Sequence, residues 1–280
     1  MTGSSLAVDI SKVSGDRSRL VSDVVAIEEP LEIQLCSTSA GGSAAKSISI
    51  TMRTPGEDAE LALGFLFTEG IIESAEQVSS TKHTGDADPE TGLRNTIRVE
   101  LLPDVDIDFA RLERHFYTTS SCGICGKASL DTLRVAGQES LRHCKDTFSR
   151  ETIVAIADRV RKRQRVFTET GGLHAAAVFD AHGDIIVVQE DVGRHNATDK
   201  VIGALLQAGR LPGNSCGLFV SGRASFELMQ KALVAGIPLL VAVGAPSSLA
   251  VKTANEFDMT LVGFLRGRNF NIYAGPGRII

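Results

Sequence analysis

Residues 216–265 read CGLFVSGRASFELMQKALVAGIPLLVAVGAPSSLAVKTANEFDMTLVGFL, and short apolar segments alternate here with longer mixed ones. The apolar segments have the length of buried strands, and the mixed segments have the spacing of amphipathic helices. Strands and helices are predicted in the order Cys216–Ser221, Phe226–Ala235, Pro238–Val243, Ser247–Phe257 and Thr260–Leu265. Such alternation predicts a largely parallel sheet covered by helices, which is the layered α/β class.

The same pattern extends outward from this stretch. A hairpin is predicted from Leu173–Phe179 and Asp184–Gln189, and a helix from Arg194 to Gln207. Thr152–Gln164 predicts one more helix, and Phe270–Tyr273 one more strand. We therefore expect residues 139–280 to form an α/β domain.

The first half of the chain predicts a smaller α+β part, residues 21–138. The motif Thr54-Pro55-Gly56-Glu57 has the composition of a capping box, so a helix is expected to begin there and to end at Gly70. Strands are predicted at 21–35, 47–52 and 95–101, with an exposed loop at 81–94. Residues 1–20 are polar and without periodicity, which predicts a flexible tail.

Charge and composition narrow the function. The chain has 280 residues, a net charge of −5 and no Trp, which argues against a nucleic-acid partner bound through a basic or stacking surface. The longest apolar run, 232–245, is interrupted by Gly236 and Pro238 and is too short to span a bilayer. No signal peptide is recognisable at the start, so a cytoplasmic location and no membrane partner are expected.

Two cysteines stand between glycines in Ser121-Cys122-Gly123-Ile124-Cys125-Gly126. Such a pair can form half of a zinc site, a redox disulfide or a carrier of transferable sulfur. No second close pair of metal ligands is present in the sequence, which disfavours zinc. Redox chemistry stays open, but its usual thioredoxin-like setting is missing.

Sulfur transfer suits this segment best. The glycines provide mobility, and residues 128–135 have helical propensity, which would place both thiols at a helix N-terminus that favours the thiolate. We therefore identify Cys122 and Cys125 as the candidate catalytic residues; two buried, inert cysteines are the less favoured interpretation. The three remaining cysteines, Cys36, Cys144 and Cys216, are expected to be structural.

Three predicted turns that open helices have the composition of anion sites: 191–196, 221–225 and 244–248. In open α/β sheets, ligands bind beyond the carboxyl ends of the strands, where such turns meet. Small residues would let backbone N–H groups approach a phosphate, and arginines would add bidentate contacts. The candidate phosphate-binding residues are Gly193, Arg194, His195, Ser221, Gly222 and Arg223. His174 is instead expected to be a hydrogen-bonded structural histidine.

Several motifs in order resemble the formate dehydrogenase accessory sulfurtransferases, and the resemblance covers nearly the whole chain after the N-terminal tail. The motifs are residues 53–58 (RTPGED), 120–126 (SSCGICG), 170–176 (TGGLHAA), 190–196 (EDVGRHN), 221–223 (SGR) and 270–273 (FNIY).

The resemblance implies a specific role. A cysteine desulfurase loads sulfur on Cys122 as a persulfide, with Cys125 as its partner, and the sulfur passes to the molybdenum or tungsten cofactor of formate dehydrogenase. The cofactor is implied to be the bis-guanine-dinucleotide form, bound by Phe270, Asn271, Ile272, Tyr273, Ala274 and Gly275. The resemblance further implies a cytidine-deaminase-like fold and a homodimer.

Three other functions remain to be separated from this one. A zinc deaminase would need a His-x-Glu motif, but His174-Ala175-Ala176 lacks the Glu, so we expect neither deaminase activity nor stoichiometric zinc. A thiol–disulfide oxidoreductase would have no use for a nucleotide. An assembly chaperone without chemistry would tolerate the loss of Cys122.

Overall fold

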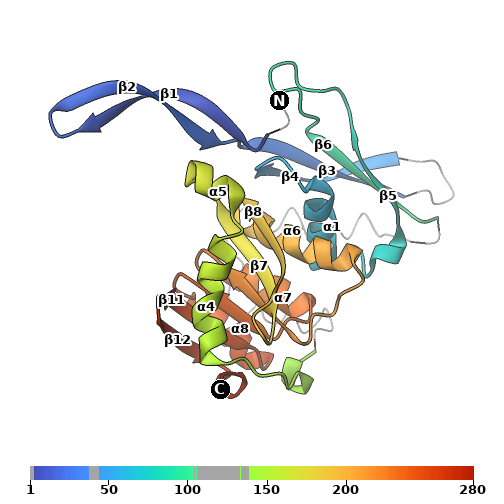
Figure 1. The fold of residues 1–280 in the computed structure, drawn as a ribbon. Helices are drawn as coiled ribbons and strands as arrows, with labels where there is room; N and C mark the ends of the chain where they lie inside the picture. Colours follow the sequence, from blue (N-terminus) through green and yellow to red (C-terminus); the bar gives the residue numbers. More distant parts are fainter. Residues whose placement is uncertain (1–2, 38–43, 104, 106–132, 134–138) are drawn as a thin grey trace.

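The computed structural model describes residues 3–37, 44–103, 105, 133 and 139–280. A large sheet with its helices forms one part, a smaller sheet forms the other, and helices α1 and α6 lie between them (Figure 1). Both predicted catalytic residues, Cys122 and Cys125, and most of the predicted helix 128–135 lie outside the described residues.

The larger sheet has six strands in the described part of the chain, in the order β12-β11-β10-β9-β7-β8. Strands β9, β10 and β11 are parallel, whereas β7, β8 and β12 pair antiparallel with their neighbours. The strands are β7 His174–Asp180, β8 Ile185–Asp191, β9 Cys216–Val220, β10 Leu239–Ala242, β11 Thr260–Arg266 and β12 Asn269–Ala274. This sheet confirms the predicted α/β class.

Helices cover both faces of the large sheet (Figure 1). Leu218 and Val220 of β9 pack in a core cluster with α6, α7 and α8, whereas Phe219 packs on the other face with α4. Successive strand residues point to opposite faces, so a strand covered on both sides must be apolar throughout. The helices are α4 Arg150–Arg161, α5 Arg165–Thr170, α6 Arg194–Gln207, α7 Phe226–Val234 and α8 Ser248–Glu256. The predicted bounds of α6 are confirmed.

The smaller sheet has the order β4-β3-β6-β5 and packs against α1. Every second residue of β3, from Leu31 through Ile33 to Leu35, is buried in this core. The elements are β3 Glu29–Ser37, β4 Ala44–Arg53, α1 Asp58–Thr68, β5 Val78–Thr84 and β6 Thr96–Leu101. Strand β5 extends into the segment expected to be a loop, because Lys82, His83 and Thr84 pair with β6.

A close backbone contact between α1 and α6 joins the two parts. A Cβ atom on Gly64 would lie 1.9 Å from the carbonyl oxygen of Asp199, and one on Gly203 would lie 1.9 Å from that of Glu60. Only glycine fits at either position, because a side chain would overlap the opposite backbone. We call this contact the glycine seam.

The chain begins with a hairpin that projects from the body (Figure 1). Its strands β1 Ser5–Ser14 and β2 Arg17–Ala26 pair antiparallel throughout, and residues 11–20 are all exposed. This differs from the flexible tail expected over residues 1–20. The alternation of β1 is hard to detect from sequence, because neither face of an isolated ribbon is buried.

The start of α1 also differs from the prediction. The residue before the helix is Glu57, in a left-handed conformation with φ 51°, and no side chain caps the helix. Thr54 instead bonds across the fold: its amide donates to Asp191 Oδ2 at 3.1 Å, and its hydroxyl accepts from the Val192 amide at 3.2 Å. A capping box depends only on local spacing, whereas here a tertiary partner takes the threonine.

Candidate phosphate site at the carboxyl edge

The three predicted anion turns meet at the carboxyl edge of the large sheet. Backbone bonds join the second turn to the third: the Gly244 amide donates to the Gly222 carbonyl at 2.9 Å, and the Ser247 amide donates to the Ala224 carbonyl at 2.9 Å. A Cβ on Gly222 would lie 3.4 Å from Cδ of Arg194, which brings the first turn against the second. The predicted convergence of the turns is confirmed.

The turns differ in which helix amides they leave uncapped. Ser247 caps α8, because its hydroxyl accepts a bond from the Ala250 amide at 3.1 Å. Neither Gly193 nor Ser225, the residues before α6 and α7, caps its helix through a side chain. Uncapped amides at a helix N-terminus favour an anion. The first two turns are therefore the candidate site, and the third supports them.

Arg194 has an unpartnered polar atom inside this site. Its Nε is inaccessible to solvent and has no hydrogen-bond partner among the described residues. A buried donor without a partner costs free energy, which an anionic ligand would recover. The arrangement therefore fits the predicted role of Arg194 in binding a phosphate.

His174 also lies beside Gly222, where a Cβ would be 3.5 Å from its ring. Its Nδ1 is 3.4 Å from the hydroxyl of Ser221, and that hydroxyl also accepts a bond from the Ala175 amide at 2.9 Å. Burial, followed by the nearby charge of Arg194, lowers the pKa of His174. The predicted hydrogen bond of His174 is present, and its structural role stays a prediction.

His195 contacts the start of α7. Its Nε2 lies 3.3 Å from the hydroxyl of Ser225 and 4.0 Å from a carboxylate oxygen of Glu227. Burial, with a further contribution from Arg194, lowers the pKa of His195 to about 4. The imidazole is therefore neutral at pH 7, so it adds no positive charge for a phosphate.

The other residues predicted in the first two turns differ in whether they are free to contact a ligand. Gly193 precedes α6, and its amide is already bonded to Asp191 Oδ1 at 2.8 Å. Arg223 is exposed, and its backbone packs closely against Gly244. Of the two predicted binding glycines, Gly222 is the one beside the Arg194 side chain, with 3.4 Å between its Cβ position and Arg194 Cδ.

Residues 270–275 are spread along β12 and do not form one cluster. Tyr273 lies near the turns, because a Cβ on Gly263 would be 3.1 Å from its ring and 3.0 Å from Pro246. Phe270 packs instead with the core on the α4 face, and Ala274 is buried. Gly275 packs against the start of β11, at the opposite edge of the sheet, and its carbonyl accepts from Thr260 at 2.6 Å. Among these residues, Tyr273 therefore lies beside the third turn, which contains Gly244 and Pro246.

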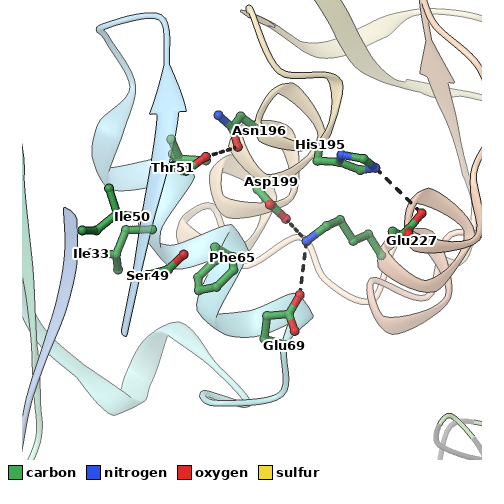
Figure 2. Close-up of a pocket in the computed structure, with 12 residues that line it drawn as sticks. Ile33, Ser49, Ile50, Thr51, Phe65, Glu69, His195, Asn196, Asp199 and Glu227 are labelled. Atoms are coloured by element: carbon green, nitrogen blue, oxygen red, sulfur yellow. Dashed lines mark hydrogen bonds and ion pairs between the residues drawn. The ribbon is translucent and has the colours of Figure 1, made fainter. Parts of the chain in front are cut away.

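A pocket of about 290 Å³ opens between the two parts of the molecule, below His195 (Figure 2). Its apolar wall includes Ile50 and Phe65. Its polar wall contains the carboxylates of Glu69, Asp199 and Glu227 against the single ammonium of Lys231. More negative than positive charge makes this pocket unfavourable for a phosphate.

Thr54 and Lys200 are buried next to the site, and sequence reasoning assigned neither of them to it. Lys200 and Asp191 form an ion pair of 2.9 Å, and both side chains are fully buried. The one available signal was a lysine on the buried side of a predicted helix, where a cation needs a partner.

The other three cysteines of the chain lie among the described residues. Cys36 and Cys144 are buried, and burial raises the pKa of the thiols of Cys144 and Cys216, which makes a structural role the better description. Within the described ranges no group of three His, Cys, Asp or Glu side chains could hold a metal ion. In that same part of the chain, no helix is long and apolar enough to cross a membrane.

Comparisons with known proteins match one family over most of the chain. A model described as the FdhD/NarQ family matches residues 26–280. "Sulfur carrier protein FdhD" of Streptomyces avermitilis is 48% identical over 259 residues, covering 92% of this chain and 89% of that protein. The protein of the same name from Mycolicibacterium paratuberculosis is 49% identical over 258 residues, 92% of each chain. That of Sulfurisphaera tokodaii is 40% identical over 273 residues, 98% of each.

A solved structure has the same fold. The crystal structure of a protein from Desulfotalea psychrophila, described as a formate dehydrogenase accessory protein, superposes with a TM-score of 0.74. The match covers 99% of this chain and all of that one, at 24% sequence identity. At this identity the likeness supports the fold alone.

Proposed function

This chain belongs to the FdhD/NarQ family, as its sequence motifs predicted, and from that premise we propose that it is a sulfur carrier in the maturation of a formate dehydrogenase. The curated relatives named sulfur carrier protein support this role, because they match at 40–49% identity over most of both chains. The transferred element follows from those names, and the client is the one that the sequence motifs imply.

A finer proposal concerns the donor and the cofactor. A cysteine desulfurase supplies the sulfur, and the molybdenum cofactor in its bis-guanine-dinucleotide form receives it before insertion. The observation that carries the cofactor part is the buried, unpartnered Nε of Arg194 beside Gly222, at the uncapped start of α6. A phosphate of the dinucleotide would complement the charge of Arg194 and could accept this hydrogen bond.

The sulfur transfer takes place at Cys122. Its thiolate attacks the terminal sulfur of the donor's persulfide, the donor's S–S bond breaks, and the donor leaves as a thiolate. Cys122 then holds the sulfur as a persulfide. For release, the Cys125 thiolate attacks Sγ of Cys122, forms the disulfide and expels the outer sulfur at the sulfide level, with both electrons coming from the two thiols. These residues lie outside the described part of the chain, so this step rests on the sequence and the family.

The first experiment tests the persulfide. The protein is incubated with a cysteine desulfurase and cysteine, and intact masses are compared for the wild type and Cys122→Ala. We expect an added mass of about 32 Da on the wild type that is absent from the variant. No added sulfur on the wild type, with an active donor, would contradict the carrier function.

The role of Cys125 needs its own measurement. The rate of sulfur delivery to the cofactor is compared between the wild type and Cys125→Ala after both have been loaded. A slower rate in the variant is expected if disulfide formation releases the sulfur. An unchanged rate would remove Cys125 from the release step and leave loading at Cys122 unaffected.

Two rival functions predict different results. A thiol–disulfide oxidoreductase would reduce insulin and would bind no guanine nucleotide, so titration with GDP separates it from the carrier. A chaperone without chemistry would activate the dehydrogenase fully as Cys122→Ala. A zinc deaminase would contain one zinc per chain by metal analysis, whereas we expect none.

The state and location of the protein complete the proposal. The family resemblance implies a homodimer, and the charge and hydropathy of the sequence lead us to expect a cytoplasmic protein with no nucleic-acid or membrane partner. Light scattering of the purified protein tests the dimer directly, and a monomeric mass at micromolar concentration would contradict it.

A further inference from the structure

The loop before α1 is fastened to the turn that presents Arg194. Thr54 donates its amide to Asp191 and accepts a bond from the Val192 amide through its hydroxyl. Its carbonyl accepts from Lys200 Nζ at 2.9 Å. All three hydrogen-bonding groups of Thr54 therefore bond to the β8–α6 turn or to α6, although Thr54 belongs to the smaller part of the molecule.

Asp191 lies at the centre of this connection. Its Oδ1 accepts from the Gly193 amide at 2.8 Å and from Asn196 Nδ2 at 3.1 Å. Its Oδ2 accepts from Thr54 and pairs with Lys200 at 2.9 Å. Both carboxylate oxygens are thus used within the protein, and the turn is held from both sides. A fully desolvated charge holds such geometry tightly, because every lost bond leaves it uncompensated.

We propose that Thr54 and Lys200 are positioning residues for the anion site. They act through Asp191, which fixes the turn at residues 191–193 and so sets where Arg194 and the first amides of α6 point. The inference rests on the proposed function, since it supplies the ligand that Arg194 binds. Neither residue touches the ligand; both set the shape of the turn that does.

The molecule contains an internal control for this proposal. Lys231 and Asp199 form a second buried pair, at 2.8 Å, with side chains 8% and 4% exposed. Thr68 completes it: its hydroxyl donates to Asp199 at 3.0 Å and accepts from Lys231 at 2.9 Å. Thr54 and Thr68 are both 2% exposed. Only the first network reaches the turn of Arg194, because the second connects α1, α6 and α7.

The test compares Thr54→Val with Thr68→Val, which remove one buried hydroxyl each and keep the side-chain shape. GDP affinity is measured by calorimetry, and stability by thermal unfolding. We expect Thr54→Val to bind GDP roughly 3- to 10-fold more weakly, the effect of one lost hydrogen bond. Thr68→Val should lose at least as much stability, because the Thr68 hydroxyl bonds to both Asp199 and Lys231, and should keep wild-type affinity. Thr54→Ser, which retains the hydroxyl, should restore binding.

The stronger pair of variants is Lys200→Met and Lys231→Met. Lys200→Met should weaken GDP binding more than Thr54→Val does, and Lys231→Met should leave it unchanged; if either fails to fold, the threonine pair still decides. Equal GDP affinity of Thr54→Val, Thr68→Val and the wild type would overturn the positioning role and leave the proposed function intact. A wild type that does not bind GDP would overturn both.

Discussion

Helix α6 belongs to two regions of opposite character. In the middle of the helix, Gly203 lies against α1 in the glycine seam, where backbone meets backbone without space for a side chain. At its first residue, Arg194 retains a buried donor that nothing in the described chain satisfies. In the seam, the absence of side chains allows close packing of the two helices. At the turn, Arg194 Nε is buried without a hydrogen bond. The difference indicates that the seam serves stability and the turn serves binding.

The largest expected effect breaks the seam. Gly64→Ala places a methyl group 1.9 Å from the Asp199 carbonyl oxygen, so α1 and α6 must separate. We expect a loss of more than about 3 kcal/mol in the free energy of unfolding, although alanine is the better helix former. Urea unfolding measures it. Gly277→Ala, with no heavy atom within 4 Å of the new methyl group, is the control. A wild-type unfolding midpoint for Gly64→Ala would show that the helices are not in contact.

The second prediction removes the unpartnered donor. Arg194→Gln should weaken GDP binding roughly 10- to 100-fold, the range for charged hydrogen bonds, without loss of stability. Calorimetry and thermal unfolding give both quantities. The control is Arg150→Gln, since Arg150 is likewise the first residue of a helix, α4, on the other face of the sheet. A variant that loses stability but keeps its affinity would assign Arg194 to the structure and not to the ligand.

The third prediction concerns His195, the neighbour of Arg194 at the start of α6, and the loss of stability in acid. The pKa of His195 is lowered from 6.5 to about 4, so the folded protein stays neutral there while the unfolded chain takes up a proton. The stability from this group is therefore complete above pH 6.5 and is lost as the pH falls from 6.5 toward 4. Because its side chain is 37% exposed, we discount the effect to the order of 1 kcal/mol.

This effect is measured as the change in urea midpoint between pH 7.5 and pH 5. His195→Gln should reduce the change, whereas substitution of the exposed His143 by Gln should not. An identical acid dependence in wild type and His195→Gln would mean that His195 is charged in the folded state.

The smallest effect is expected in the hairpin, which belongs to neither region. Leu20 is 84% exposed, so Leu20→Ser should change the free energy of unfolding by no more than about 0.5 kcal/mol. This value sets the background against which the other changes are judged. A larger loss of stability, measured by urea unfolding, would show that Leu20 is covered in solution.

Sequence reasoning predicted the regular elements of the second half well, because their periodicity is produced by burial. The bounds of α6 and the positions of β7–β12 follow from apolar spacing and from glycines such as Gly209 and Gly236. Sequence reasoning was wrong where a contact with a distant part of the chain replaced the expected local one, or where a strand has no buried face. Thr54 looked like a helix cap and is instead bonded to Asp191 and Val192, and the first strands had no buried face to reveal them.

The candidate site divides along the same line. The sequence by itself determined the thiol pair Cys122 and Cys125, the family, and three glycine- and serine-rich turns that would open helices, because these depend on residue type and local spacing. Only the tertiary structure decided that Ser247 caps its own helix and that His195 contacts Ser225 as a neutral imidazole. It also decided that the Nε of Arg194 has no partner among the described residues. Solvation and pairing depend on neighbours distant in the chain, and local sequence does not specify which neighbours those are.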